Sequence, residues 1–481
     1  MRLAIVHYHL QRGGVTRVIA TALEALGPSI EKAVVLSSTE PAEPLPWPVA
    51  VIPELAYTDR ASPALALRIS KAMQAAAREH LGGIPDLWHV HNHSLGKNAS
   101  FPEALKQLAD QGTPLLLQIH DFAEDGRPGN YRRQRDPYEK GILENPETAF
   151  YPVAPQIGYA VLNGRDRDIL RAAGIPASNL FWLPNAVTTP PLESGGPTAR
   201  TGDRPLVLYP TRGIRRKNIG ELLLQAMASP DHRYATTLAP ENPQWKAVHA
   251  QWAELASRLG LAVRLGLAQA SGIRFEELVR EADSMITTSV AEGFGLAFLE
   301  PWLFGKPVTG RDLPDITRDF KDNGISFPGL YREWPVALSL IDASGLQNRF
   351  KTTARQVYAD YGLPLPQGDL DEAWERLTAD GRIDFARLDE IAQMQCLEAL
   401  HQSREICLPE TSPEPVATPA GTVETNARRI RQIYGLAPYR EKLLSAYKAL
   451  LEAPAGEPQG VPPDRVLGQF LDLDRLYLLR T

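Results

Sequence analysis

Short apolar runs alternate with amphipathic stretches along the first part of the chain. The run LAIVHY (3–8) ends at a Gly-Gly turn, QRGG, and VTRVIATALEAL follows with apolar residues at helical spacing. Further predicted strands are DLWHVH (86–91), PLLLQIH (114–120) and IGYAVLN (157–163), separated by helical segments such as PEALKQLADQ. This alternation predicts an α/β domain with a parallel sheet covered by helices on both faces.

The same pattern restarts after a segment rich in Pro, Gly, Ser and Thr, which predicts a linker. The second set of strand candidates is PLVLYP (205–210), YATTLAP (234–240), LAVRLG (261–266) and DSMITTS (283–289). Residues 340–410 indicate mostly helix, and NARRIRQIYGLAPYREKLLSAYKALLEA (426–453) predicts a single amphipathic helix. The expected divisions are an N-terminal domain over 1–187, a linker over 188–204, a C-terminal domain over 205–422, and a helix with a tail over 423–481.

Composition and charge exclude several classes of protein. The 481 residues are 43% hydrophobic and 22% charged, which is typical of a soluble globular protein. A net charge of −6 argues against a nucleic-acid partner, and no apolar run reaches the ~18 residues of a membrane span. The N-terminus shows no secretory segment, and only Cys396 and Cys407 are present, so we expect a cytoplasmic protein.

The stretch SVAEGFGLAFLEP (289–301) is the first candidate for chemistry. A Gly-rich turn from strand to helix presents free N–H groups that suit a diphosphate. Glu292 and Glu300 stand eight positions apart, ~12 Å if helical throughout, whereas the paired carboxyls of glycosidases lie at ~5–9.5 Å. The spacing favours two contacts along one elongated ligand. Two solvated glutamates of a helix are the alternative for this stretch taken alone.

A basic loop precedes it in the sequence. YPTRGIRRKNIGELLLQA (209–226) places Arg212 after a strand and Lys217 before a helix. Two cations on such a loop suit a diphosphate, arginine by its planar fork and lysine as a point charge. A solvated surface loop is the alternative. In doubly wound domains ligands bind outside the carboxyl ends of the strands, so we expect the site in a cleft if these edges face one another.

Arg-x4-Lys-Asn followed by S-x-x-E-G-F-G-x-x-x-x-E resembles the retaining nucleotide-sugar glycosyltransferases of family 4. QRGGVTRV (11–18), PDLWHVHNH (85–93), PLLLQIHDF (114–122) and LPNAV (183–187) are similar to further landmarks of that family. The resemblance covers roughly residues 1–325. It implies the GT-B fold, which has two doubly wound Rossmann-like domains facing across a cleft and a C-terminal helix crossing back to the N-domain.

The resemblance also implies roles for individual residues. Arg212 and Lys217 would hold the donor diphosphate and stabilise charge on the departing nucleotide. Glu292 would contact the donor sugar, Glu300 the nucleotide ribose, and His120 the transferred sugar. The remaining residues implied at the donor are Gly13, Gly14, Gly293, Phe294, Gly295, Leu296 and Ala297. Pro301 departs from the family pattern, because a proline inside a helix removes one backbone hydrogen bond.

The acceptor side is less specific in the sequence. The segment after His120 is long and basic, and we interpret it either as a loop for an anionic acceptor or as a mobile solvated lid. The candidate acceptor residues are His91, Asn92, His93, Arg127, Tyr131, Arg132 and Arg133. WHVHNH could suggest a metal, but we expect its alternating histidines to face opposite sides of the strand. The family needs no metal, so no metal site and no cofactor are predicted.

The reaction predicted is transfer of a hexose from a nucleotide-diphosphate sugar, such as UDP-glucose or GDP-mannose, to a small polar acceptor that is anionic in one version of the hypothesis. Same-face attack would retain the anomeric configuration. The alternatives are a sugar-nucleotide epimerase, a phosphorylase on a similar fold, or a non-catalytic nucleotide-sugar-binding subunit. A Rossmann oxidoreductase is disfavoured because QRGGVTRV lacks G-x-G-x-x-G. Membrane association is not expected, and a homodimer is left open.

Overall fold

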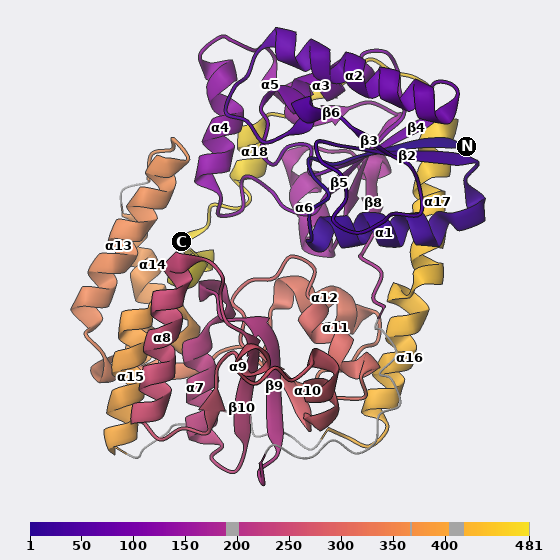
Figure 1. Cartoon of the computed structure of the whole chain (residues 1–481). Helices are drawn as coiled ribbons and strands as arrows, with labels where there is room; N and C mark the ends of the chain where they lie inside the picture. Colours follow the sequence, from indigo (N-terminus) through magenta and orange to yellow (C-terminus); the bar gives the residue numbers. More distant parts are fainter. Residues whose placement is uncertain (189–201, 366–367, 404–417, 481) are drawn as a thin grey trace. The chain divides into compact units, whose positions relative to one another are not determined.

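Two compact units make up the chain in a computed structural model that describes residues 1–188, 202–365, 368–403 and 418–480 (Figure 1). Unit 1 contains Met1–Ala186, Asp360–Leu363 and Ile433–Asp472, and unit 2 contains Val187–Ala359, Pro364–Gln432 and Leu473–Thr481. Each unit has its own parallel sheet and its own apolar core.

Unit 1 has a seven-stranded parallel sheet of order β3-β2-β1-β4-β5-β7-β8. Its strands are β1 Arg2–Val6, β2 Lys32–Ser37, β3 Val49–Val51, β4 Leu87–His91, β5 Leu115–Ile119, β7 Ile157–Val161 and β8 Leu180–Trp182. The helices are α1 Gly14–Leu26, α2 Pro63–Leu81, α3 Ser100–Ala109, α4 Pro128–Glu139, α5 Pro146–Phe150, α6 Gly164–Ala173, α17 Leu436–Glu452 and α18 Pro463–Leu467. β4, β5 and β7 are buried throughout, because helices cover both faces of the sheet, whereas the edge strands β3 and β8 are partly exposed.

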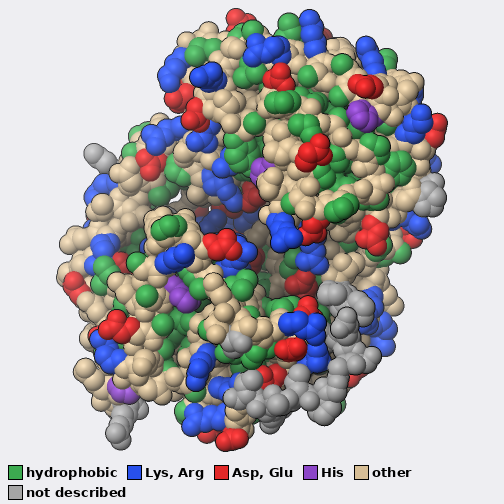
Figure 2. Space-filling model, in the orientation of Figure 1, with side chains coloured by type: hydrophobic (Ala, Val, Ile, Leu, Met, Phe, Trp, Pro, Cys, Tyr) green, Lys and Arg blue, Asp and Glu red, His purple; other side chains and the backbone are tan. Residues whose placement is uncertain are grey.

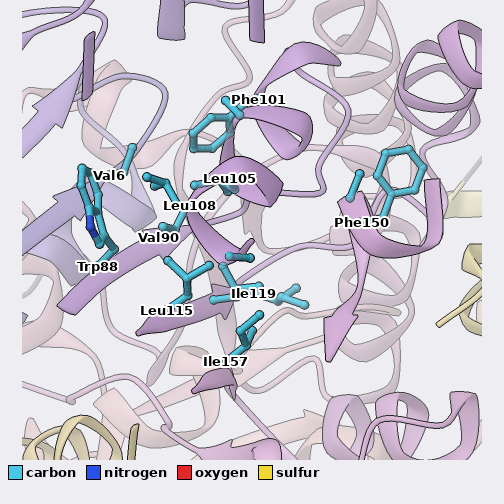
Figure 3. Packing of buried hydrophobic residues seen from close by; sticks show 14 of the residues in the cluster. Val6, Trp88, Val90, Phe101, Leu105, Leu108, Leu115, Ile119, Phe150 and Ile157 are labelled. Carbon is cyan, nitrogen blue, oxygen red and sulfur yellow. The ribbon is translucent and has the colours of Figure 1, made fainter. Parts of the chain in front are cut away.

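Apolar side chains of alternate strand positions form two separate clusters in unit 1. Figure 3 shows the first cluster, in which Val6, Val90 and Ile119 of the sheet pack against Phe101 and Leu108 of α3. In the second cluster, residues of the intervening positions pack against α1 and α17; they are Leu3, Ile5, Leu116 and Ala160. This period-2 division is what a sheet with two covered faces requires.

Unit 2 has a six-stranded parallel sheet of order β11-β10-β9-β12-β13-β14. Its strands are β9 Leu206–Arg212, β10 Arg233–Leu238, β11 Val263–Arg264, β12 Ser284–Thr287, β13 Val308–Arg311 and β14 Gly329–Tyr331. The helices are α7 Ile219–Ala228, α8 Pro243–Arg258, α9 Leu267–Ser271, α10 Phe275–Glu281, α11 Leu296–Leu303, α12 Pro314–Asp322, α13 Ala343–Asp360, α14 Asp369–Leu377, α15 Glu390–Ser403 and α16 Thr422–Tyr434.

A buried ion cluster ties this sheet to its surroundings. The guanidinium of Arg311, at the end of β13, donates to Glu221 of α7 at 2.8 Å and to Asp384 at 2.8 Å. The hydroxyl of Tyr331 donates to Glu221 at 2.6 Å. Arg311 and Glu221 are almost fully buried, so every charge in the cluster depends on the others for compensation.

The prediction of two doubly wound parallel sheets is confirmed, and two local predictions are wrong. The predicted single helix over 426–453 is two helices, α16 and α17, because Gly435 is extended and Pro438 lies in the first turn of α17, where a missing N–H costs little. The segment after His120 was expected as a loop but contains α4, which begins at Pro128. Most residues of α4 are polar, so the segment lacks the periodic apolar positions from which a helix is predicted.

Apart from Val187, which falls in unit 2, the contact-based units differ from the expected domains in three places. Residues 423–432 belong to unit 2, where Asn426 of α16 exchanges two hydrogen bonds with the backbone of Ser326. Residues 473–480 also belong to unit 2, whereas 360–363 belong to unit 1. Most of the predicted linker, 189–201, and Cys407 lie outside the described residues. No described helix is both long and apolar enough to cross a bilayer.

Candidate functional site

The basic loop of unit 2 begins where β9 ends, at Arg212, and runs through a 3₁₀ turn, Arg215–Lys217, into α7. Asn218 adopts the left-handed conformation between the turn and the helix. The Arg212 side chain is 56% exposed and lies 3.5 Å from the Glu241 carboxylate, whereas Lys217 is only 14% exposed. Of the two predicted diphosphate ligands at the carboxyl end of the sheet, Arg212 is therefore accessible and Lys217 is largely enclosed.

The Lys217 ammonium points at the loop that follows β12. It donates to Oε1 of Glu292 at 2.5 Å, and the Ser289 hydroxyl donates to the same oxygen at 2.6 Å. Arg216 donates to the carbonyl of Ala291 at 2.8 Å, and its guanidinium lies 3.5 Å from Oε2 of Glu292. The structure thus joins the two motifs that the sequence separated by some seventy residues.

Glu292 is held as a carboxylate by these contacts. Burial raises its pKa, but the charges of Lys217 and Arg216 and the hydrogen bonds from Lys217 and Ser289 outweigh burial, and the net pKa lies below the ordinary 4.5. A deprotonated carboxylate beside a hydroxyl donor and two cations can accept hydrogen bonds from a polyhydroxyl ligand. It is not left free as an isolated nucleophile.

The glycine turn leads directly into α11. Gly295 has φ 95°, and a Cβ there would lie 2.6 Å from Cγ2 of Ile316, so both the backbone conformation and the packing require glycine. Gly293 is exposed and Phe294 is buried against Phe320. Leu296 and Ala297 form the first turn of the helix, where backbone N–H groups have no intrahelical acceptor.

Glu300 and Pro301 lie inside α11, which continues to Leu303. As predicted, the glycine turn separates the two glutamates: α11 begins at Leu296, so Glu292 lies in the preceding turn and Glu300 inside the helix. The ~12 Å estimate for a fully helical stretch therefore does not apply. Glu300 remains half-buried in the helix that the turn starts.

In unit 1 the Gly-Gly turn starts α1, with Gly13 as the residue before Gly14. A Cβ at Gly14 would have no heavy atom within 4 Å, and one at Gly13 would only approach the carbonyl of Gln11 at 3.8 Å. The space beside both glycines is open. They lie at the carboxyl end of β1, the same edge of the sheet as His91 and His120.

Four histidine rings gather at this edge. The rings of His89 and His91 stack with centroids 4.3 Å apart, and Nδ1 of His91 shares a hydrogen bond with Nε2 of His120 at 2.9 Å. The ring of His7 lies edge-on to His91 at 6.3 Å. The expectation that alternating histidines face opposite sides is wrong for His89 and His91, because residues two apart on a strand share a face.

A chain of hydrogen bonds fixes His89 beneath the cluster. Its Nε2–H donates to Oε1 of Gln118 at 2.9 Å, and its Nδ1 accepts from the hydroxyl of Tyr447 on α17 at 2.8 Å. Burial lowers the pKa of His7 and His89 to about 4 and that of His120 to about 3. The rings at this edge are therefore neutral at pH 7.

The side chains of Asn92 and His93 form hydrogen bonds with backbone groups. Asn92 has φ 55°, and its side-chain oxygen accepts the N–H groups of His120 and Asp121 at 2.8 and 3.2 Å. His93 is buried and its Nε2–H donates to the carbonyl of Phe150 at 2.8 Å. Asn92 thereby positions the residue that carries the predicted sugar contact, whereas His93 points into the core.

The four predicted acceptor residues around α4 all have carboxylate or backbone contacts. Arg127 donates to Asp121 at 2.5 Å, and Arg132 lies 3.4 Å from Asp360. Arg133 pairs with Asp59. Tyr131 is buried and its hydroxyl donates to Asp464 at 3.0 Å. Figure 2 shows Lys and Arg side chains interspersed with Asp and Glu over the described surface of one face.

Sequence reasoning missed residues that support the candidates. In unit 2 these are Ser289 and Tyr209, whose hydroxyls lie 2.7 Å apart beneath Glu292. Ser289 opens the S-x-x-E motif, so its spacing was visible. In unit 1 they are His7, His89 and Tyr447, for which the sequence signals were the position of His7 directly after β1 and the place of His89 in WHVHNH. Within the described ranges, no group of three or more His, Cys, Asp or Glu side chains is arranged to hold a metal.

The chain is similar to glycosyltransferases both in sequence and in structure. No protein-family model matches the chain. The chain is 25% identical to the mannosylglucosyl-3-phosphoglycerate synthase of Petrotoga mobilis, with 99% of each chain covered. Among solved structures it is similar to a sucrose-phosphate synthase from Thermosynechococcus elongatus, at 17% identity and a TM-score of 0.52, covering 93% and 98% of the two chains. It is also similar to Anabaena HepE in complex with UDP and glucose, at 14% identity and a TM-score of 0.51, covering 93% and 100%.

Proposed function

We propose that this chain, a glycosyltransferase of the GT-B fold, transfers a hexose from a nucleotide-diphosphate sugar to a small anionic acceptor with retention of the anomeric configuration. The observation that carries the proposal is the joined loop pair of unit 2, in which Lys217 and Arg216 hold Glu292 beside a glycine turn. It combines cations for a diphosphate with a carboxylate for sugar hydroxyls.

The donor binds to unit 2 in this proposal. Arg212 and Lys217 hold the diphosphate, and the N–H groups of Gly295, Leu296 and Ala297 assist at the start of α11. Glu292 accepts from sugar hydroxyls, while Glu300, one turn into the helix, accepts from the ribose. The backbone N–H groups of Gly293 and Phe294 belong to the same turn.

The acceptor binds to unit 1, where Gly13 and Gly14 leave space for it and His120 hydrogen-bonds the transferred sugar as a neutral imidazole. The acceptor oxygen bonds to the anomeric carbon as the bond to the donor phosphate breaks. The acceptor proton passes to an oxygen of that phosphate on the same face. Glu292 has an orienting role, because Lys217 and Ser289 engage its Oε1 and the Arg216 guanidinium lies 3.5 Å from its Oε2.

The acceptor class is suggested by the Petrotoga relative, whose name describes a phosphoglycerate glycoside as its product. A phosphorylated, carboxylated glycoside fits the small anionic acceptor that the basic segment after His120 predicts. Arg212 and Lys217 supply the positive charge that the leaving nucleotide needs, and we propose that the chemistry requires no metal and no further cofactor.

The test begins with thermal unfolding of the full chain without metal, in the presence of a panel of nucleotide diphosphates and nucleotide sugars. A ligand at 100 times its Kd adds ~2.7 kcal/mol to the stability of the unit that binds it. The matching donor is then incubated with candidate acceptors, and the anomeric configuration of the product is read by NMR. Failure of every nucleotide to shift the transition of the folded protein would refute the donor site.

A further inference from the structure

We infer that Lys97, with Arg127 and Arg133, forms the site in unit 1 that binds the phosphate or carboxylate group of the acceptor. The inference deepens the proposed function and rests on it for the identity of the ligand as an acceptor. Lys97 lies in the turn after β4, Arg127 in the segment after β5, and Arg133 in α4. All three segments follow the carboxyl edge of the unit 1 sheet, at which His120 stands.

The turn that carries Lys97 is pressed against the start of α4. Gly96 has φ 70°, and a Cβ there would lie 2.0 Å from the carbonyl oxygen of Asn130. Arg133 donates back to the carbonyl of Gly96 at 3.1 Å. On the other side, the N–H of Thr58 donates to the carbonyl of Lys97 at 2.9 Å. The turn is therefore fixed on two sides, and the lysine backbone is preorganised.

The Lys97 ammonium has no carboxylate partner within ion-pairing distance among the described residues. Its contact is with the ring of Tyr57, whose centroid is 5.2 Å from Nζ. Burial lowers the pKa of Lys97, and the charges of Arg133 and Arg127 lower it further, while Asp121 raises it. The ammonium thus stands half-buried beside two guanidinium groups, where an anion would relieve the repulsion.

The neighbouring carboxylates leave this positive charge uncompensated. Asp121 engages Arg127 and Asp59 engages Arg133, which leaves the charge of Lys97 in excess. The Asp59 side chain is 83% exposed, so Arg133 can exchange it for a ligand oxygen at small cost, since exposed ion pairs contribute little. The hydroxyl of Tyr57 shares a hydrogen bond with Nε2 of His9 at 2.9 Å, which holds the ring beneath the ammonium.

The chemical class that fits is a compact oxyanion on a small molecule. Lysine offers a point charge and arginine a fork, and together they suit a phosphomonoester or a carboxylate. A glycoside of phosphoglycerate carries both groups. The site would therefore select acceptors by their charged end, while His120 and the donor read the sugar end.

The experiment uses isothermal titration of the full chain with 3-phosphoglycerate and, separately, with inorganic phosphate. Lys97→Gln should weaken 3-phosphoglycerate binding about 10- to 100-fold, the range for a hydrogen bond to a charged group. Lys97→Arg should retain binding within a few-fold. The matched control is Lys448→Gln, which removes an exposed lysine paired with Glu452 on α17 and should change nothing.

Two results would overturn the inference: no binding of either anion to the unchanged protein at millimolar concentration, or equal affinity in Lys97→Gln and Lys448→Gln. Donor binding is followed in parallel through the shift of the unfolding midpoint by the matching nucleotide sugar. If anion binding fails while the donor shift persists, the acceptor-anion site is wrong and the glycosyltransferase proposal stands. If the donor shift fails while Lys97→Gln still weakens anion binding, the donor site of the proposed function is wrong and the anion site at Lys97 stands.

Discussion

The carboxyl edges of the two sheets solve the burial of polar groups in opposite ways. In unit 1 the edge is built from neutral rings, with His89, His91 and His120 stacked and sharing hydrogen bonds. In unit 2 the edge is built from full charges, with Lys217 and Arg216 against Glu292. The same α/β architecture thus places a cluster of neutral rings at one edge and a cluster of compensated charges at the other.

The difference teaches which chemistry each edge can perform. The half-buried imidazole of His120, whose pKa has fallen to about 3, can donate or accept a hydrogen bond at neutral pH but does not carry charge. A carboxylate held by Lys217 remains ionised, and the same lysine can stabilise a departing phosphate. Contact with sugar hydroxyls suits the first edge, and a leaving group that gains charge suits the second.

The largest expected effect comes from removing the charge of unit 2. Lys217→Ala should lower kcat by about 10²–10³, the cost typical of losing one preorganised donor to developing charge. Steady-state transfer with the matching donor measures it, and Lys246→Ala, at an exposed position of α8, is the control. If both variants kept the unchanged rate, the two edges would not differ in the way described.

The second-largest effect is expected from a substitution in the glycine turn at the same edge of unit 2. Gly295→Ala forces a Cβ into a left-handed position and toward Ile316, and we expect it to destabilise unit 2 by about 1–3 kcal/mol. Denaturant unfolding would report the loss. Gly305→Ala, which also has a positive φ but no atom within 4 Å of the added Cβ, separates backbone strain from steric overlap. Equal losses in the two variants would mean that the contact with Ile316 contributes nothing.

Acid should distinguish the two units. The pKa values of His7 and His89 fall from an ordinary 6.5 to about 4 on folding, so the unfolded chain binds more protons between these values. Their contribution to stability is full above pH 6.5 and is lost as pH falls toward 4, at up to ~1.4 kcal/mol per pH unit for each ring. Glu292, whose pKa is lowered, keeps its contribution until pH falls below 4.5.

Hydrogen exchange at pH 7.0, 5.5 and 4.5 measures this separately for each unit. Amides of β1, β4 and β5 should lose protection first, and those of β9 and β12 later. Loss of protection in both units at the same pH would contradict the assignment of neutral rings to one edge and charges to the other.

The smallest effect is expected at Arg132. Its side chain is 54% exposed and pairs with Asp360 at 3.4 Å, and exposed pairs contribute ~0.2–1 kcal/mol. Arg132→Ala should change the acceptor KM by less than about twofold, which separates it from Lys97. A tenfold rise in the acceptor KM of Arg132→Ala would instead place the acceptor on the outer face of α4.

The sequence was sufficient for the architecture because periodicity encodes it. Buried strands such as PLLLQIH and amphipathic runs such as VTRVIATALEAL alternate clearly, and the structure has strands and helices there. The short strand β13 was not assigned, because four residues that contain a glycine carry little periodicity. α4 was missed because it is polar on most of its surface and contains Pro137.

The candidate site was predictable only where its contacts are local or carried by a motif. Lys217 and Glu292 were assigned to one donor site through their motifs, although the ion pair between them was not predicted, and Ser289 stands three residues from Glu292. The partners of α4 were not predictable, since Tyr131 bonds to Asp464, more than three hundred residues away. The stacking of His89 on His91 could have been predicted, because residues two apart on a strand share a face; the prediction that they face opposite sides applied this rule wrongly.

The position of Tyr447 has a consequence for how the protein is made. Unit 1 is incomplete without α17, whose Tyr439, Leu443 and Tyr447 fill the core against Leu3 and Ile5. The ribosome produces most of unit 2, residues 187–359 and 364–432, between these two parts, which takes tens of seconds at ~5–20 residues per second. One face of the N-terminal sheet therefore stays uncovered until α17 has been made. This interval is the stage of synthesis at which a chaperone would be needed most.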